Sequence, residues 1–260
     1  MKSLLCIGLA ACLFMTLPAS AFAIEPLRIG VADEPYPPFT WKEPDGKWKG
    51  FEIDLSMAIC AAIKIQCVTV DTEWDELIQA LTTKKIDMIM SSMVITDERR
   101  KLIDFTIPYY STGGAFMGSK GSVLVLTPDG MKGKTIGVQG STTHAADVRS
   151  KFGDVATIRT YPTQEEANDE LVAKRVDVVL ADKVALAEFL KEPQASGLAI
   201  LADVPPGERG ITKVGAGLRK EDKALTGEVN AAITTLLANG GYDHLAKPYF
   251  DFDIYGLPRK

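Results

Sequence analysis

The chain repeats one supersecondary pattern at an interval of ninety residues. In both copies a helix end leads into a basic turn and a short apolar run that stops at small polar residues. The two copies are residues 81–92 (LTTKKIDMIMSS) and 171–182 (LVAKRVDVVLAD). A second pair, 28–31 (RIGV) and 135–138 (TIGV), matches more weakly. Two similar α/β units in one chain predict two lobes with a cleft between them.

The ends of the two copies carry complementary polar groups. The first copy ends in the hydroxyls of Ser91 and Ser92, with Arg99 close behind, and the second ends in the carboxylate of Asp182. Ligands of open α/β sheets bind beyond the carboxyl ends of the strands, where these residues are expected. A cleft with a cation on one wall and an anion on the other suits a zwitterion such as an amino acid.

The first 23 residues have the pattern of a cleavable export signal and are excluded from the fold. Lys2 is followed by an almost uninterrupted apolar run over 3–17, and 21–23 (AFA) is a small-x-small cleavage site. No later stretch is apolar for about 18 residues, so we expect a soluble, exported mature chain. A lipoprotein box that ends at Cys12 is a less favoured alternative, because the apolar run continues past it.

Cleavage would remove 23 of 260 residues and leave 237, enough for two lobes of roughly 100–120 residues. The net charge changes from −5 to −6 with the loss of Lys2, which argues against nucleic acid as a partner. Cys60 and Cys67 remain, and export favours a disulfide between them. Their spacing fits neither a zinc site nor a redox-active Cys-x-x-Cys motif.

Strands and helices alternate along the mature chain, which predicts mostly parallel sheets flanked by helices. Periodicity places strands at 27–31, 67–70, 86–90, 134–138, 158–161, 176–180 and 213–218, and helices at 51–63, 75–81, 164–173, 183–190, 223–239 and 242–249. Residues 111–114 have the composition of a crossing point. We expect lobe 1 to comprise 24–111 and 213–260 and lobe 2 to comprise 112–212, joined by two hinge crossings.

Polar and aromatic side chains that follow the predicted strands are candidates for ligand binding. Arg99 can grip a carboxylate bidentately, although a surface arginine in a charged helix start has the same pattern. Residues 141–143 could present N–H groups to an anion or simply cap a helix, and Asp182 could bind an ammonium or cap the next helix. Tyr36 and Trp74 could enclose a flat or cationic side chain, although a tryptophan is more often part of a core.

Catalytic patterns are weak by comparison. The histidines are His144 and His244, and the sequence contains no Gly-x-Ser-x-Gly elbow, His-Glu-x-x-His helix or phosphate-binding loop. We therefore expect no catalytic residues, no metal site and no cofactor.

Several short segments occur in a specific order and spacing over nearly the whole mature chain. They are 36–39 (YPPF), 50–55 (GFEIDL), 84–87 (KKID) with 90–92 (MSS), 95–96 (IT) with Arg99, 139–143 (QGSTT), 217–222 (GLRKED) and 249–253 (YFDFD). Together they resemble the bacterial periplasmic binding proteins for polar amino acids. The resemblance is strongest to the lysine/arginine/ornithine- and histidine-binding proteins of ABC importers.

The resemblance implies a two-lobed periplasmic binding protein fold of type II and a set of residue roles. Arg99, helped by Ser92 and Thr143, would bind the ligand α-carboxylate. Asp182, assisted by Ser91, would bind the α-ammonium. The side chain would pack on Tyr36 and Trp74, with its distal positive charge at Asp33, a task that Glu34 could share. The ligand-binding set implied is Asp33, Tyr36, Trp74, Ser91, Ser92, Val94, Arg99, Gln139, Thr142, Thr143, His144 and Asp182.

The resemblance further implies a Cys60–Cys67 disulfide, a periplasmic location and docking of the closed form on a membrane permease. We expect a monomer that binds arginine, lysine, ornithine or histidine. Trp74, Val94 and His144 depart from the family pattern, where a smaller residue, a serine and a glutamine are common, and all three shape the side-chain pocket.

Three alternatives follow from the same resemblance. An opine ligand stays open because 139–143 also resembles opine binders. Periplasmic dehydratases share the fold, but the Arg99–Asp182 pair favours zwitterion binding over that chemistry. A sensor domain is less favoured, because no membrane span precedes the end of the chain at Lys260.

Overall fold

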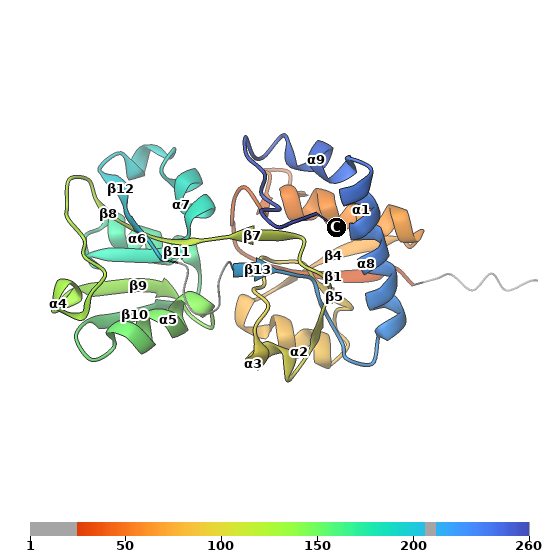
Figure 1. Cartoon of the computed structure of the whole chain (residues 1–260), viewed down its shortest axis with the longest axis horizontal. Coiled ribbons are helices and arrows are strands. Elements are labelled where there is room, and N and C mark those ends of the chain that lie inside the picture. Colours follow the sequence, from red (N-terminus) through yellow and green to blue (C-terminus); the bar gives the residue numbers. More distant parts are fainter. Residues whose placement is uncertain (1–24, 206–211, 260) are drawn as a thin grey trace, which may run out of the picture.

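Two lobes lie side by side in the computed structural model, which describes residues 25–205 and 212–259 (Figure 1). Each lobe is built on a five-stranded sheet, ordered β4-β1-β5-β14-β6 in lobe 1 and β10-β9-β11-β8-β12 in lobe 2. The expected export signal and the lipoprotein box at Cys12 fall outside the described residues. Within those residues, no helix is both long and apolar enough to cross a membrane.

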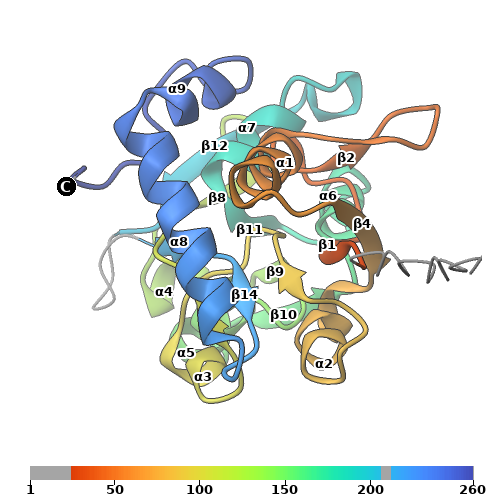
Figure 2. The ribbon, with the colours of Figure 1, turned by 90° about the vertical axis from the view of Figure 1, so that its right-hand side faces the viewer.

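Lobe 1 takes its elements from both ends of the chain. Its sheet strands are β1 (Leu27–Ala32), β4 (Cys67–Thr72), β5 (Met88–Ile89), β6 (Asp104–Phe105) and β14 (Gly217–Leu218), with a hairpin of β2 (Trp41–Lys42) and β3 (Trp48–Lys49). Its helices are α1 (Phe51–Ile63), η1 (Trp74–Glu76), α2 (Leu77–Thr82), α3 (Asp97–Arg100), α8 (Lys223–Ala238) and α9 (Gly241–Ala246). In Figure 2 lobe 1 faces the viewer, and α1 packs against α8 and α9.

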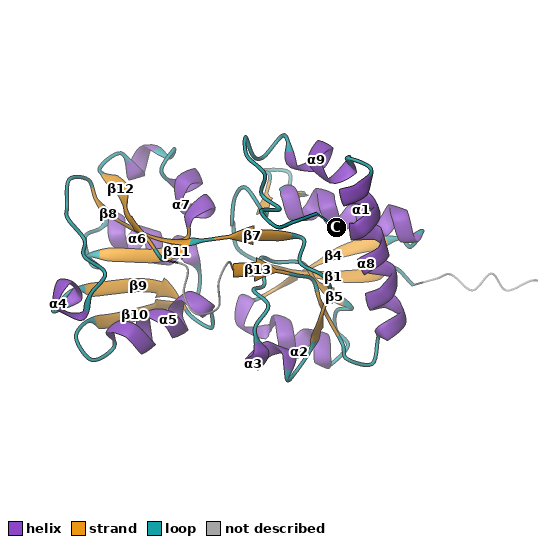
Figure 3. Ribbon diagram, viewed as in Figure 1, coloured by secondary structure: helices purple, strands orange, loops and turns teal. Residues whose placement is uncertain are grey.

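Lobe 2 is a single stretch of the chain. Its strands are β8 (Gly114–Ser119), β9 (Thr135–Gln139), β10 (Thr157–Tyr161), β11 (Val178–Asp182) and β12 (Leu198–Asp203). Its helices are α4 (Pro128–Met131), α5 (Thr143–Phe152), α6 (Gln164–Val172), α7 (Lys183–Phe189) and η2 (Pro193–Ala195). Helices cover both faces of each sheet (Figure 3), and each lobe has a separate apolar cluster on either face.

The sequence repeat corresponds to a repeat of backbone geometry. β5 lies beside β1 as β11 lies beside β9, in parallel. The turn before each of these strands contains a lysine with a left-handed backbone conformation, Lys84 (φ 62°) in one and Lys174 (φ 58°) in the other. The aspartate that follows accepts from the first strand in both copies: Asp87 Oδ2 from Arg28 N–H at 3.1 Å, and Asp177 Oδ2 from Thr135 N–H at 2.6 Å. The predicted two-lobed α/β architecture is confirmed.

The sheets are mostly parallel, as expected, with one strand in each that runs against the other four. β14 runs antiparallel to β5 and β6, and β8 runs antiparallel to β11 and β12. β8 and β12 were not predicted. Gly114 and Gly118 interrupt the apolar pattern of β8, and β12 follows a helix and shows no clear alternation of apolar and polar residues. The expected strand 213–218 is divided in two, since Gly215 and Ala216 separate β13 from β14.

The two lobes are joined by a pair of antiparallel strands. β7 (Tyr110–Thr112) pairs with β13 (Thr212–Val214), so the chain leaves lobe 1 and re-enters it at the same place (Figure 1). Two adjacent extended connections leave the lobes free to rotate about them, as in hinge closure. The predicted crossing at 111–114 overlaps β7; the lobe boundaries 111/112 and 212/213 stay a prediction.

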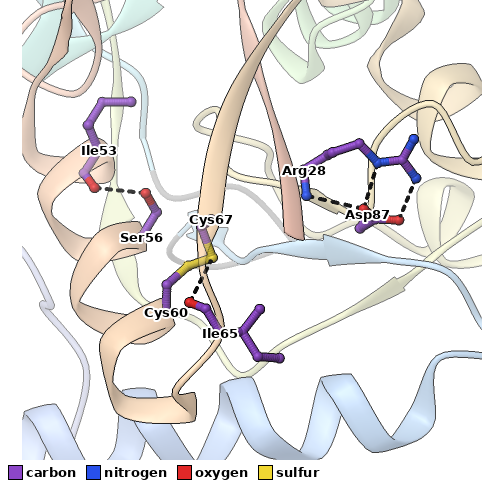
Figure 4. Close-up of a disulfide and its surroundings, with 7 residues drawn as sticks. All are labelled: Arg28, Ile53, Ser56, Cys60, Ile65, Cys67 and Asp87. Atoms are coloured by element: carbon purple, nitrogen blue, oxygen red, sulfur yellow. Dashed lines mark hydrogen bonds and ion pairs between the residues drawn. A yellow bond between two sulfur atoms is a disulfide. The ribbon is translucent and has the colours of Figure 1, made fainter. Parts of the chain in front are cut away.

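A disulfide joins α1 to β4, which confirms the predicted pair. Cys60 lies in the last turn of the helix and Cys67 opens the strand, with Cα atoms 6.1 Å apart (Figure 4). The intervening turn is tight, with Lys64 in the left-handed region (φ 59°). The bridge therefore fastens one helix of lobe 1 to an edge strand of its sheet.

Replacing Cys60 and Cys67 together by alanine should lower the free energy of unfolding by about 2–3 kcal/mol, because a closed loop in the unfolded chain is lost. Urea unfolding followed by circular dichroism measures the change. The unmutated protein unfolded in a reducing agent is the control and should match the variant. An unchanged unfolding midpoint would show that the bridge does not constrain the unfolded chain.

Candidate functional site

A pocket lies between the lobes at the carboxyl ends of β1, β5, β9 and β11. It encloses about 520 Å³, part of it open to solvent. Both lobes contribute to its wall, and the lining residues are Ala32, Glu34, Tyr36, Trp74, Ser91, Ser92, Val94, Arg99, Gln139, Thr142, Thr143, His144, Gln164 and Asp182. The structure thus brings together every residue predicted to bind ligand except Asp33.

Asp33 points away from the pocket. Its carboxylate pairs with Lys42 Nζ at 2.5 Å on the surface, and its side chain is 43% exposed. Side chains alternate beyond the end of β1, so Ala32, Glu34 and Tyr36 face the pocket while Asp33 does not. Asp33 was the residue predicted to meet the distal positive charge of the ligand, and Glu34 was named only as one that could share this role.

Glu34 is a buried carboxylate that spans the cleft. It accepts hydrogen bonds from two groups of lobe 2, the side-chain amide of Gln139 and the backbone N–H of Gln164 at 3.0 Å. Burial raises the pKa of Glu34 to about 7, although both hydrogen bonds act in the opposite direction. A cation placed beside Glu34 would favour its charged form.

Asp182 ends β11 inside the pocket and is 4% exposed. It stands at the N-terminus of α7 without forming a side-chain capping bond, so the alternative of a simple helix cap does not describe its carboxylate. Instead it accepts from the Tyr36 hydroxyl at 3.0 Å and lies 3.3 Å from His144 Nε2. No lysine or arginine among the described residues pairs with it, which leaves a buried anion that an ammonium could neutralise.

Arg99 faces the pocket from α3 and is not a surface residue of a charged helix. Its guanidinium donates to the backbone carbonyls of Val94 at 2.8 Å and Ser141 at 3.1 Å, and stacks over Trp74 at 5.4 Å. Burial lowers the pKa of Arg99 to about 10. No carboxylate within residues 25–205 and 212–259 forms an ion pair with this guanidinium, so it is available to bind a ligand carboxylate.

The loop before α5 combines capping with pocket lining. Thr142 caps the helix, since its hydroxyl oxygen accepts from Ala145 N–H at 3.0 Å and donates to the Gln139 carbonyl at 2.8 Å. The capping alternative therefore describes Thr142, while Thr143 and His144 line the pocket beside it. Ser141 before them has a left-handed backbone (φ 54°).

Contacts across the cleft show a closed arrangement. Trp74 Nε1–H donates to the Gly140 carbonyl at 3.1 Å, next to the Arg99–Ser141 contact. The Tyr36–Asp182 and Glu34–Gln164 hydrogen bonds join the lobes at other points of the wall. Groups from lobe 1 therefore satisfy carbonyls and carboxylates of lobe 2 and vice versa, which holds the pocket walls together.

Within residues 25–205 and 212–259, no group of three or more His, Cys, Asp or Glu side chains is placed to hold a metal ion. The pocket instead combines one unpaired guanidinium with the carboxylates of Asp182 and Glu34.

Comparison with known proteins identifies the family. The profile of the bacterial extracellular solute-binding proteins, family 3, matches residues 27–252. The chain belongs to this family. It is 43% identical over 260 residues to the L-arginine-binding protein of Pseudomonas aeruginosa, covering 98% of this chain and 99% of that protein.

Two further similar proteins are named for amino-acid binding. It is 38% identical over 261 residues to the lysine/arginine/ornithine-binding periplasmic protein of Escherichia coli, covering 98% of this chain and 99% of that one. A solved structure titled an ancestral arginine-binding protein bound to arginine is similar with a TM-score of 0.80. The two are 30% identical, and the match covers 86% of this chain and 97% of the other.

Three polar or small residues of the site were not predicted. Ala32 and Gln164 line the pocket, and Glu52 lies directly behind it, bonded to Ser92. Gln164 opens α6 just after β10, so the rule of looking beyond strand ends would have found it. Glu52 lies in a helix, and its place under the pocket depends on how α1 packs, which periodicity does not give.

Proposed function

We propose that this protein is the periplasmic solute-binding component of an ABC importer and binds a basic amino acid in the interlobe pocket. The observation that carries the proposal is the charge inventory of the pocket wall. One guanidinium faces the pocket without a carboxylate partner among the described residues, and two buried carboxylates line the same pocket. The complementary ligand has one carboxylate and two cations, as arginine, lysine and ornithine do.

The site residues have distinct roles in this proposal. Arg99, with Ser92 and Thr143, receives the α-carboxylate, and Asp182, with Ser91, receives the α-ammonium. The distal cation meets Glu34, and not Asp33, because only Glu34 reaches the pocket. Tyr36 and Trp74 wall the aliphatic stem, with Val94, Gln139, Thr142 and His144 completing the lining.

Relatives support the ligand class and the location. The two proteins compared by sequence are named for arginine and for lysine, arginine and ornithine, and one of them is named as periplasmic. Both are named for binding alone, which supports a binding protein over an enzyme. We infer a monomer that releases its ligand to a membrane permease once the closed lobes have docked on it.

A thermal-shift screen of ligand-stripped protein tests the proposal. Arginine, lysine, ornithine and histidine are compared with leucine, glutamate and octopine. A ligand at 100 times its dissociation constant should add about 2.7 kcal/mol to stability, a shift of several degrees. A shift with basic amino acids alone supports the proposal. A shift with octopine alone would indicate an opine binder, and no shift at all would refute a basic amino-acid ligand.

Arg99→Ala should weaken binding of every amino-acid ligand by about 30-fold or more, since a buried charge contact of about 2–5 kcal/mol is removed. Titration calorimetry measures the loss. Arg100→Ala is the matched control, because Arg100 is exposed and stacks on Phe105 outside the pocket. Equal affinity of Arg99→Ala and the unmutated protein would exclude Arg99 from the site.

Glu34→Gln and Asp33→Asn form a matched pair of adjacent carboxylates. The first should weaken arginine binding by about 10–100-fold through loss of a charged hydrogen bond of about 1.5–3 kcal/mol, and the second by less than about twofold. Calorimetry with arginine compares them. A larger loss in Asp33→Asn would place the distal cation at Asp33 instead.

The ionisation of Glu34 predicts the direction in which arginine affinity changes with pH. Burial raises the pKa of Glu34 to about 7, so Glu34 is largely protonated at lower pH. A bound cation favours the carboxylate, and arginine affinity should therefore rise as the pH increases from about 6 to about 7. Glu34→Gln should abolish that rise.

A further inference from the structure

Ser92 is held from behind the pocket by a carboxylate that does not line it. Glu52 accepts from Ser92 N–H at 2.7 Å and lies 3.0 Å from the Ser92 hydroxyl, and it also accepts from the Tyr109 hydroxyl. Ser92 adopts a left-handed backbone (φ 52°) that L-residues rarely favour. Glu52 is 0% exposed, and both of its carboxylate oxygens contact Ser92 or Tyr109 and not solvent.

The hydroxyl of Ser92 has one hydrogen to give. When Glu52 is ionised it can only accept, so Ser92 must donate that hydrogen to it and turn its lone pairs elsewhere. A ligand carboxylate is also only an acceptor, and it would then meet oxygen lone pairs at Ser92. When Glu52 is protonated it can donate to the Ser92 oxygen, which frees the Ser92 hydrogen for the ligand.

We propose that Glu52 is a proton-linked positioning residue, which takes up one proton from solvent as the ligand carboxylate binds beside Ser92 and Arg99. The proton stays on the carboxyl oxygen that faces the Ser92 hydroxyl, and the Ser92 hydroxyl keeps its hydrogen but turns it to donate a hydrogen bond to the ligand carboxylate. This inference rests on the proposed function, because it requires a carboxylate ligand in the pocket.

The surroundings of Glu52 favour this exchange. The titratable groups that face it are the hydroxyls of Tyr109 and Tyr110 and, through space, the carboxylate of Asp182. None is a cation, and the Tyr110 hydroxyl lies next to that of Ser92. Burial raises the pKa of Glu52 to about 7 before any ligand binds, although the hydrogen bonds from Tyr109 and Ser92 lower it.

The ligand carboxylate would place a negative charge beside Ser92 and so raise the pKa of Glu52 further. The ligand ammonium would lower the pKa of Glu52. It would, however, bind at Asp182, whose hydrogen bonds go to Tyr36 and His144 and not to Glu52. A group protonated more strongly in the bound state makes affinity fall as pH rises above its free-state pKa. Ligand affinity should thus weaken by up to about tenfold per pH unit above about pH 7.

Glu52→Gln tests the coupling, because a glutamine amide can donate to Ser92 and accept from Tyr109 as the protonated acid does. Dissociation constants for arginine are measured by calorimetry from pH 7 to 8.5. The unmutated protein should lose affinity over this range, and Glu52→Gln should show no such loss. Asp54→Asn is the control on the same helix, since Asp54 accepts from Tyr249 outside the pocket and should leave the slope unchanged.

Calorimetry of the unmutated protein at pH 8 in two buffers of different ionisation enthalpy counts the protons directly. We expect uptake of up to about one proton per ligand, since Glu34 is then largely ionised before binding and contributes little. Binding without uptake, or an equal pH slope in Glu52→Gln, would overturn the inference and leave the proposed function intact. Absence of binding by any basic amino acid would overturn both. If Glu52→Gln fails to fold, the proton count alone decides.

Discussion

The site depends on charges that are buried in the interlobe pocket without permanent counter-ions. Asp182 is held by a tyrosine hydroxyl and a histidine ring, and Arg99 by two backbone carbonyls, so in the described chain no lysine or arginine pairs with Asp182 and no carboxylate pairs with Arg99. Unpaired buried charges are costly, and that cost falls when a complementary ligand enters. A closed pocket of this kind discriminates strongly, because a molecule that lacks one of the matching charges leaves the cost in place.

Two further carboxylates surround these charges, and burial raises the pKa of each to about 7. Glu34 faces the pocket and Glu52 lies behind its wall, so a bound cation and a bound anion act on them with opposite sign. A pocket with this arrangement would bind a basic amino acid best near neutral pH. The two glutamates come from different elements, the loop after β1 and the start of α1, and are separately testable.

Closure follows from the way the chain crosses between the lobes. β7 and β13 pair side by side and are the extended links that join the described parts of the two sheets. Hydrogen bonds bridge the cleft, among them Trp74 with Gly140, Arg99 with Ser141 and Glu34 with Gln164. Hydrogen bonds of this kind contribute about 1 kcal/mol each between neutral groups and about 1.5–3 kcal/mol where one group is charged. The ligand can therefore shift the balance between open and closed forms.

The sequence alone determined the repeat, and with it two α/β lobes and the residues that follow equivalent strands. Ser92 and Asp182 stand ninety residues apart at the same position of that repeat, so local pattern sufficed to place both in one pocket. Only the tertiary structure decided which neighbouring carboxylate faces the pocket and which group supports Ser92. Asp33 and Glu34 differ by one step of backbone alternation, and Glu52 meets Ser92 through the packing of α1 behind the sheet. Both outcomes depend on side-chain direction and long-range packing, which strand and helix periodicity do not encode.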